Sequence, residues 1–271
     1  MHLHLAGPGL RQRPRADGRL VGMREAQPLY DRIGGRYAGG RQPDPRIAAR
    51  IEQALGAAAS VVNVGAGTGS SEPGDRGVVA VEPSPVMAAQ RPAGAAPCVR
   101  ATAEALPFAD GTFGAAMAIL SLHHWTDKPR GLAEMRRVAR GPVVLFGGCD
   151  RDLNTSWWLH DYFPATRGLV FERTYPPERI AEVLGPVTLI PVPIPADCVD
   201  GFEAAYWRHP AAVLDPAVWS ATSALSLISE GERAAGMARL RADLADGAWR
   251  EAYGHLLEQD ELDLGYRVIV A

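Results

Sequence analysis

Residues 61–69 read VVNVGAGTG, an apolar run that stops in three alternating glycines. This pattern predicts a buried β-strand followed by a tight turn. Glycine suits such a turn because it accepts positive φ and has no Cβ to hold a ligand away from the backbone N–H groups. We therefore expect a ligand on the turn, although a turn without a ligand explains the glycines alone equally well.

The same kind of boundary recurs on both sides of this stretch. Asp44, followed by proline, is typical of a helix start, and apolar residues at i, i+4 and i+8 continue that helix to Gly56. Residues 78–81 form a second apolar run that ends at Glu82, and a serine and a proline then begin another helix. Strand, acidic residue and helix thus follow one another without a gap.

Strands and helices alternate through the first half of the chain. Strands are predicted at residues 61–64, 78–81, 98–100, 113–120, 142–146, 187–192 and 264–270. Apolar strands buried on both faces favour an α/β, doubly wound, mostly parallel sheet. Only eight residues separate Gly69 from Val78, which is too short for the usual crossover helix. We keep the parallel arrangement because of the wider alternation.

The second half is mainly helical in pattern. Helices are predicted at residues 177–185, 200–208, 215–229 and 232–244. We therefore divide the chain into a disordered leader over 1–22, a ligand-binding core with N-terminal helices over 23–150, and a helical cap with the last strands of the same sheet over 151–271. A weak helix is expected within the core over residues 25–37.

Composition excludes several classes of function. The chain has 271 residues, a net charge of -3 and three scattered cysteines, and its isoelectric point is near 6.2. These values do not favour nucleic-acid or membrane partners, a disulfide framework or a metal site. We expect a cytoplasmic protein that is a monomer or a homodimer and that acts on a small molecule.

Chemically useful residues follow successive strands. In a parallel sheet the carboxyl ends of the strands are where ligands bind. A carboxylate such as Glu82 suits the two hydroxyls of a ribose, because it can only accept hydrogen bonds. His123 and His124 follow a later strand, where an imidazole is able to accept a proton from a bound ligand.

Three ordered motifs carry a family resemblance. Residues 61–69, residues 79–84 with Met87, and residues 103–113, which include the sequence LPFADGTF, resemble the successive motifs of class I S-adenosylmethionine-dependent methyltransferases. The variety they most resemble includes the ubiquinone and menaquinone biosynthesis enzymes. The resemblance implies a Rossmann-like seven-stranded sheet with a helical cap, in which the last strand is antiparallel. It also implies S-adenosylmethionine as the cofactor and S-adenosylhomocysteine as its product.

The resemblance implies a set of site residues. Those expected to bind the cofactor are Tyr30, Tyr37, Arg41, Asn63, Gly65, Ala66, Gly67, Gly69, Glu82, Ser84, Met87, Ala103, Glu104 and Ser121. His124, or else His123, is the expected catalytic base, although methyl transfer also proceeds by positioning alone. The aromatic residues expected around the acceptor are Trp125, Trp157, Trp158 and Tyr162, for which packing between the cap and the core is the alternative.

Two departures from the family pattern stay open. Asn63 stands where the family usually has an acidic residue, and Gly114 stands where Phe-Asp is common.

The expected function is in-line methyl transfer to a small organic acceptor, with aromatic compounds and secondary metabolites as the leading classes. A nicotinamide-dependent oxidoreductase and a catalytically silent S-adenosylmethionine-binding protein are the alternatives. The spacing of the glycines disfavours the oxidoreductase, since a dinucleotide motif requires GxGxxG.

Overall fold

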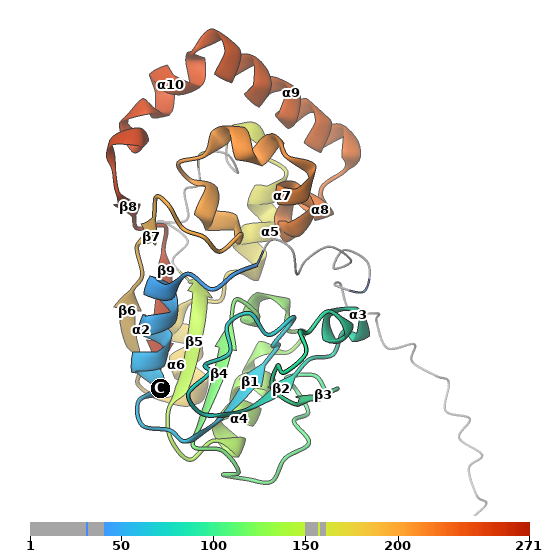
Figure 1. Cartoon of the computed structure of the whole chain (residues 1–271), viewed down its shortest axis with the longest axis vertical. Helices are drawn as coiled ribbons and strands as arrows, with labels where there is room; N and C mark the ends of the chain where they lie inside the picture. The colour runs from blue at the N-terminus through green and yellow to red at the C-terminus, as the bar shows by residue number, and fades with distance from the viewer. Residues whose placement is uncertain (1–30, 32–40, 150–156, 158–160) are drawn as a thin grey trace, which may run out of the picture.

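A single seven-stranded sheet organises the structure, a computed structural model that describes residues 31, 41–149, 157 and 161–271. The strand order is β3-β2-β1-β4-β5-β9-β6 (Figure 1). The five parallel strands are β1 (Ser60–Val64), β2 (Gly77–Val81), β3 (Cys98–Val99), β4 (Ala115–Ile119) and β5 (Val143–Gly148). The strand β9 (Tyr266–Val270) runs antiparallel to both β5 and β6 (Thr188–Pro191). The predicted fold class, with its antiparallel last strand, is confirmed.

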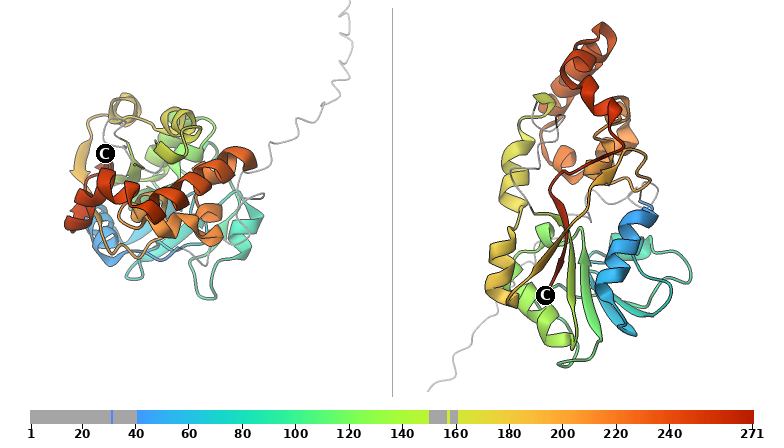
Figure 2. Two further views of the ribbon diagram at one scale, coloured as in Figure 1. Left: turned by 90° about the horizontal axis from the view of Figure 1, so that it is seen from above. Right: turned by 90° about the vertical axis from the view of Figure 1, so that its left-hand side faces the viewer.

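Helices cover both faces of the sheet. Helix α2 (Pro45–Leu55) lies on one face, and α4 (Lys128–Val138) and α6 (Pro177–Leu184) lie on the other (Figure 2). Successive side chains of a strand point to opposite faces, so Val61 packs with α2 whereas Val62 packs with α4 and α6. Asn63 shares the α2 face with Val61, which makes it a polar residue on an otherwise apolar wall.

The predicted helix starts are confirmed by their caps. The side chain of Asp44 accepts a hydrogen bond from the backbone N–H of Arg46 at the start of α2. Ser84 caps α3 (Pro85–Ala89) through the N–H of Met87, and Asp127 caps α4 in the same way. Each cap satisfies one of the N–H groups that a helix start leaves without an internal partner.

The crossover between β1 and β2 contains turns and no helix, yet the two strands pair in parallel from Ser60 with Gly77 to Val64 with Val81. Arg76 supports this crossover by donating to the carbonyl of Gly56 at the end of α2. The parallel arrangement that we kept is therefore confirmed in spite of the short connection.

Most of the second half forms a cap beyond the carboxyl ends of the parallel strands, whereas α6, β6 and β9 return to the sheet (Figure 1). The helices of the cap are α5 (Thr166–Arg173), α7 (Pro216–Ala221), α8 (Ser223–Leu227), α9 (Glu230–Asp246) and α10 (Ala248–Tyr253). Three short 3-10 segments, η4 (Glu203–Tyr206), η5 (Pro210–Leu214) and η6 (Gly254–Glu258), and the strand pair β7 (Ile194–Pro195) and β8 (Glu261–Leu262) complete it. None of the helices in the described part of the chain is long and apolar enough to cross a membrane.

Two cap helices differ from prediction. The helix expected over 200–208 is only the 3-10 segment η4, because Asp200 pairs with Arg41 instead of capping a helix. The helix expected over 215–229 is divided at Thr222, whose backbone is extended and whose hydroxyl donates to Val218 in the last turn of α7. The predicted leader over 1–22 lies outside the described residues. Of the predicted helix over 25–37, only Asp31 is described, and it is helical.

Candidate active site

A cavity of about 210 Å³ opens at the carboxyl ends of β1, β2 and β4. The order of the sheet reverses between β1 and β4, which is where ligands bind in open α/β sheets. The sequence-predicted residues that line this cavity are Arg41, Asn63, Gly65, Ala66, Gly67, Glu82, Ser84, Met87, Ala103, Glu104, Ser121, His124 and Trp125. The fold thus brings together segments that lie more than fifty residues apart in the chain.

Some predicted residues lie elsewhere. Gly69, His123, Trp157 and Tyr162 do not line the cavity. Tyr30, Tyr37 and Trp158 lie outside the described residues.

The glycine turn is closed by contacts that exclude a side chain. Gly65 and Gly67 have φ of 72° and 55°. A Cβ on Gly65 would lie 2.6 Å from Cβ of Ser121 at the end of β4, which is too close for any real contact. The hydroxyl of Ser121 donates to the carbonyl of Val64 at 2.9 Å and so ties the end of β4 to the end of β1. Glycine is therefore required for the two strand ends to meet at the cavity floor.

Glu82 is buried beside this turn, with 5% of its surface exposed. Its two carboxylate oxygens accept hydrogen bonds from the N–H of Gly67 at 2.8 Å and the N–H of Ser84 at 2.9 Å. Burial raises the pKa of Glu82 above its ordinary value, and the two backbone N–H groups oppose that rise. Each oxygen retains a second lone pair, so the carboxylate is still able to accept from two ligand hydroxyls.

Asn63 presents an unused acceptor. It is 2% exposed, and its Oδ1 has no hydrogen-bond partner among the residues that the structure describes. Its Nδ2 faces Oε1 of Glu72 at 3.5 Å. A buried acceptor without a partner is uncommon, and in a cavity wall it indicates a ligand that supplies a hydrogen-bond donor.

Two carboxylates that sequence reasoning missed also reach the site. Asp31 accepts a hydrogen bond from the hydroxyl of Ser84. Asp200 pairs with Arg41, and the distance from Nε to Oδ1 is 2.5 Å, with both side chains nearly buried. Their partners are 53 and 159 residues away in the chain, so no local pattern could have identified them.

The chain just after β4 contains His124, the candidate catalytic base. Leu120 has φ of 52°, an uncommon conformation for a residue other than glycine, and it lines the cavity. The chain then enters the 3-10 segment η2 (Leu122–His124), which directs His124 to the cavity wall. The ring of His123 stacks obliquely on that of His124, with 3.8 Å between centroids. His123 therefore lies beside the candidate base and not in the cavity lining.

Trp125 and Glu104 join the segments around the loop after β4 that line the cavity. Trp125 is 8% exposed, and a Cβ on Gly131 of α4 would lie 2.5 Å from its ring. Glu104 accepts hydrogen bonds from the N–H of Thr126 and of Asp127, which joins the loop after β3 to the loop after β4. These contacts hold the loops after β3 and β4 together at the cavity.

The aromatic residues expected around the acceptor lie in different places. Trp125 lines the cavity, whereas Trp157 and Tyr162 are buried in the interior of the cap. The Nε1 of Trp157 donates to the carbonyl of Trp207 at 2.6 Å, and the hydroxyl of Tyr162 donates to Asp243 at 2.9 Å. The polar groups of these two residues are satisfied within the cap and their rings meet at right angles, as expected of packing residues.

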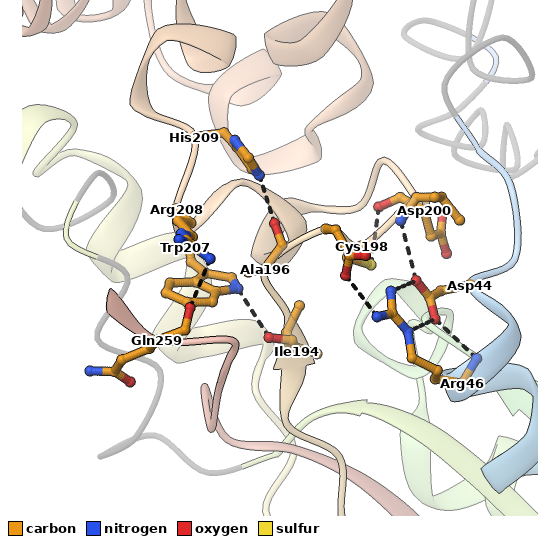
Figure 3. Close-up of polar contacts among 12 residues, drawn as sticks. Asp44, Arg46, Ile194, Ala196, Cys198, Asp200, Trp207, Arg208, His209 and Gln259 are labelled. Carbon is orange, nitrogen blue, oxygen red and sulfur yellow. Dashed lines mark hydrogen bonds and ion pairs between the residues drawn. The ribbon is translucent and has the colours of Figure 1, made fainter. Parts of the chain in front are cut away.

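Side chains at the start of α2 attach the core to the segment that leads into the cap (Figure 3). Asp44 at the start of α2 accepts from Arg46 and from the N–H of Val199. A few residues further along, the Nε1–H of Trp207 donates to the carbonyl of Ile194, and His209 bonds that of Ala196. The side chain of Asp44 is fully buried, so this junction is a fixed part of the fold.

Comparison with known proteins identifies the family. A model of a methyltransferase domain matches residues 62–145. A solved structure from Anabaena variabilis, described as a methyltransferase of an antibiotic biosynthesis pathway, is 32% identical and covers 86% of this chain and 98% of its own, with a TM-score of 0.80. The chain belongs to the class I S-adenosylmethionine-dependent methyltransferases.

Other solved structures resemble this methyltransferase more distantly. A methyltransferase from Thermotoga maritima is 20% identical over 61% of this chain and 83% of its own, with a TM-score of 0.46. A protein described as a methyltransferase from Bacillus halodurans is 14% identical over 82% of this chain and 95% of its own, with a TM-score of 0.48. These two add nothing to the assignment. No protein of curated function matches the sequence.

Family membership implies that S-adenosylmethionine binds, and the residues fit it. The glycine turn leaves room beside the backbone, Glu82 has acceptor capacity suited to a ribose, and the unpartnered Oδ1 of Asn63 suits an ammonium group. Membership also sets aside the nicotinamide-dependent oxidoreductase. Within the described residues, no group of three His, Cys, Asp or Glu side chains is placed to hold a metal ion.

Proposed function

We propose that this methyltransferase methylates a small organic acceptor, of an aromatic or secondary-metabolite class, held between the strand ends and the cap. The observation that carries the proposal is the cavity itself, whose lining contains Glu82, Asn63 and His124 together. The relative from Anabaena variabilis, described as part of an antibiotic biosynthesis pathway, supports an acceptor of this class.

The donor side of the cavity is defined by hydrogen-bonding capacity. Glu82 binds the ribose hydroxyls, and Asn63 accepts from the ammonium of the methionine moiety. Arg41 lines the same cavity, and its guanidinium is oriented by Asp200, so it is placed to bind the carboxylate of that moiety. Ser84 and Met87 lie along the ribose–adenine edge, and Ala103 and Glu104 lie further out, next to the adenine.

Apolar side chains and neutralised charges favour a small, weakly charged acceptor. Ile119, Leu120 and Trp125 supply apolar surface to the cavity. Arg41 is paired with Asp200, so its positive charge is compensated. A nucleic-acid acceptor would instead require a basic surface leading to the site.

S-adenosylmethionine supplies an electrophilic methyl group on a sulfonium, so catalysis consists mainly in holding the acceptor in line with it. Ser121 fixes the end of β4 against the glycine turn, and this contact limits how far an acceptor can enter. His124 is placed to receive the proton that an acceptor hydroxyl, amine or ring N–H releases as its lone pair binds the methyl carbon.

The test is a panel of phenolic, quinol and indole-like acceptors incubated with S-adenosylmethionine, with S-adenosylhomocysteine release as the readout. We expect turnover with at least one class, and in H124N a fall in kcat of about 100-fold with little change in cofactor affinity. H123N, whose ring stacks on the same histidine outside the cavity lining, is the matched control and is expected to retain most of kcat. Binding of S-adenosylmethionine without turnover across the panel would favour the catalytically silent alternative.

A further inference from the structure

A buried ion pair lies behind the glycine turn. Glu72 belongs to the crossover between β1 and β2, and Arg91 follows α3. The Nη2 of Arg91 donates to both carboxylate oxygens of Glu72 at 2.8 Å, and the two side chains are only 6% and 9% exposed. Neither residue lines the cavity beside the turn, so the site described above does not account for this pair.

The pair holds the turn from behind. The Nη1 of Arg91 donates to the carbonyl of Gly67 at 3.4 Å, and its Nη2 donates to the carbonyl of Ala96 at 2.9 Å. A Cβ on Gly69 would lie 2.8 Å from Nη1 of Arg91 and 3.1 Å from Oε2 of Glu72. The third glycine of the turn is therefore needed to admit the ion pair, which explains why Gly69 is absent from the cavity lining.

The carboxylate of Glu72 decides the orientation of the Asn63 side chain. A carboxylate only accepts hydrogen bonds, so the amide of Asn63 must direct its Nδ2–H toward Oε1 of Glu72. The two ends of an amide have nearly the same shape, and packing alone would not distinguish them. Oδ1 is then left buried in the wall of the cavity, with no hydrogen-bond partner among the described residues.

We propose that Glu72, held in place by Arg91, is a positioning residue that turns Oδ1 of Asn63 toward a cationic N–H donor, the ammonium of the cofactor's amino-acid moiety. The inference rests on the proposed placement of that moiety at Asn63. A buried acceptor without a partner costs free energy, and a cationic donor recovers that cost when it binds. A glutamine at position 72 would present either end of its amide to Asn63, and the preference would be lost.

Two ligands that differ only beyond the thioether test this role. S-adenosylhomocysteine contains the ammonium, whereas 5′-methylthioadenosine has the same adenosine and sulfur without the amino-acid moiety. In E72Q we expect the dissociation constant of S-adenosylhomocysteine, measured by calorimetry, to rise about tenfold, and that of 5′-methylthioadenosine to stay unchanged. D75N, which removes an exposed carboxylate three residues along the same crossover, is the matched control and should alter neither constant.

A second variant separates orientation from folding. The carboxylate introduced by N63D has an acceptor at both ends and needs no partner to orient it. Affinity for S-adenosylhomocysteine should therefore return to within about threefold of the original in N63D/E72Q. The inference would be overturned if the double variant still bound S-adenosylhomocysteine weakly, if E72Q weakened the binding of both ligands equally, or if E72Q had no effect. Each of these results would leave the proposed function intact. Failure of the unmodified protein to bind S-adenosylhomocysteine would overturn both.

Discussion

Replacing Glu82 by glutamine tests the ribose side of the site. The carboxylate accepts from the N–H of Gly67 at 2.8 Å and of Ser84 at 2.9 Å, and it retains two acceptor positions for ligand hydroxyls. In E82Q the amide nitrogen faces one of these N–H groups, and the oxygen that remains is neutral. Hydrogen bonds to a charged acceptor contribute about 1 kcal/mol more than neutral ones, so two weakened bonds and one lost acceptor amount to about 3 kcal/mol.

We therefore expect E82Q to bind S-adenosylhomocysteine about 100-fold more weakly by calorimetry. The affinity of 5′-methylthioadenosine should fall equally, because that ligand carries the same ribose. The pH dependence provides a second readout. Burial raises the pKa of Glu82 above its ordinary value of 4.5, and only the ionised form accepts from both hydroxyls. The affinity of the unmodified protein should thus decline as the pH falls through that raised pKa, whereas that of E82Q should not.

The reasoning on Glu82 would be refuted by a folded E82Q protein that binds S-adenosylhomocysteine within about threefold of the original affinity. Circular dichroism and the thermal midpoint establish that the variant is folded. A loss confined to S-adenosylhomocysteine, with 5′-methylthioadenosine unaffected, would place the carboxylate at the amino-acid moiety instead of the ribose.

Three further predictions concern stability. The hydrogen bond from Arg46 lowers the pKa of Asp44 from 3.8 to about 2. In urea denaturation above pH 5, the free energy of unfolding of D44N should therefore be about 2 kcal/mol lower than that of the unmodified protein, and the difference should disappear as the pH falls from 3.8 to 2. A difference that persists at pH 2 would contradict this. D200N leaves the buried guanidinium of Arg41 without its counter-charge and should lower the free energy of unfolding by on the order of 3 kcal/mol. D197N, which removes an exposed carboxylate, is the control and should leave the urea midpoint unchanged. Gly69 and Gly56 both have a positive φ, but only at position 69 would an added Cβ meet the ion pair of Glu72 and Arg91. G69A should therefore lower the thermal midpoint well beyond G56A. Equal midpoints would show that the ion pair moves aside to admit the Cβ.

The junction between the cap and the core gives these stability variants a functional meaning. Arg41 lines the cavity, and its partner Asp200 belongs to the segment that leads into the cap. Asp44 binds the same segment through the N–H of Val199. Loss of either carboxylate is therefore expected to weaken cofactor binding as well as the fold, because the orientation of Arg41 depends on the position of that segment.

The sequence by itself determined the sheet, its helices and much of the cavity wall. The glycine turn of residues 65–69, Glu82 and His124 could be predicted because each follows an apolar run, and the carboxyl ends of parallel strands meet at one edge. Capping residues and their prolines located the helix starts for the same reason, since the signal is contained within a few neighbouring residues.

Only the tertiary structure decided which side chains hold that wall in place. The ion pairs of Asp200 with Arg41 and of Glu72 with Arg91 join segments whose separation in the chain carries no local signal. Packing likewise placed Trp157 inside the cap, because aromatic composition does not specify which surface a ring will meet. Strand ends are set by short-range pattern, whereas the orientation of Asn63 depends on a carboxylate brought to it by the fold.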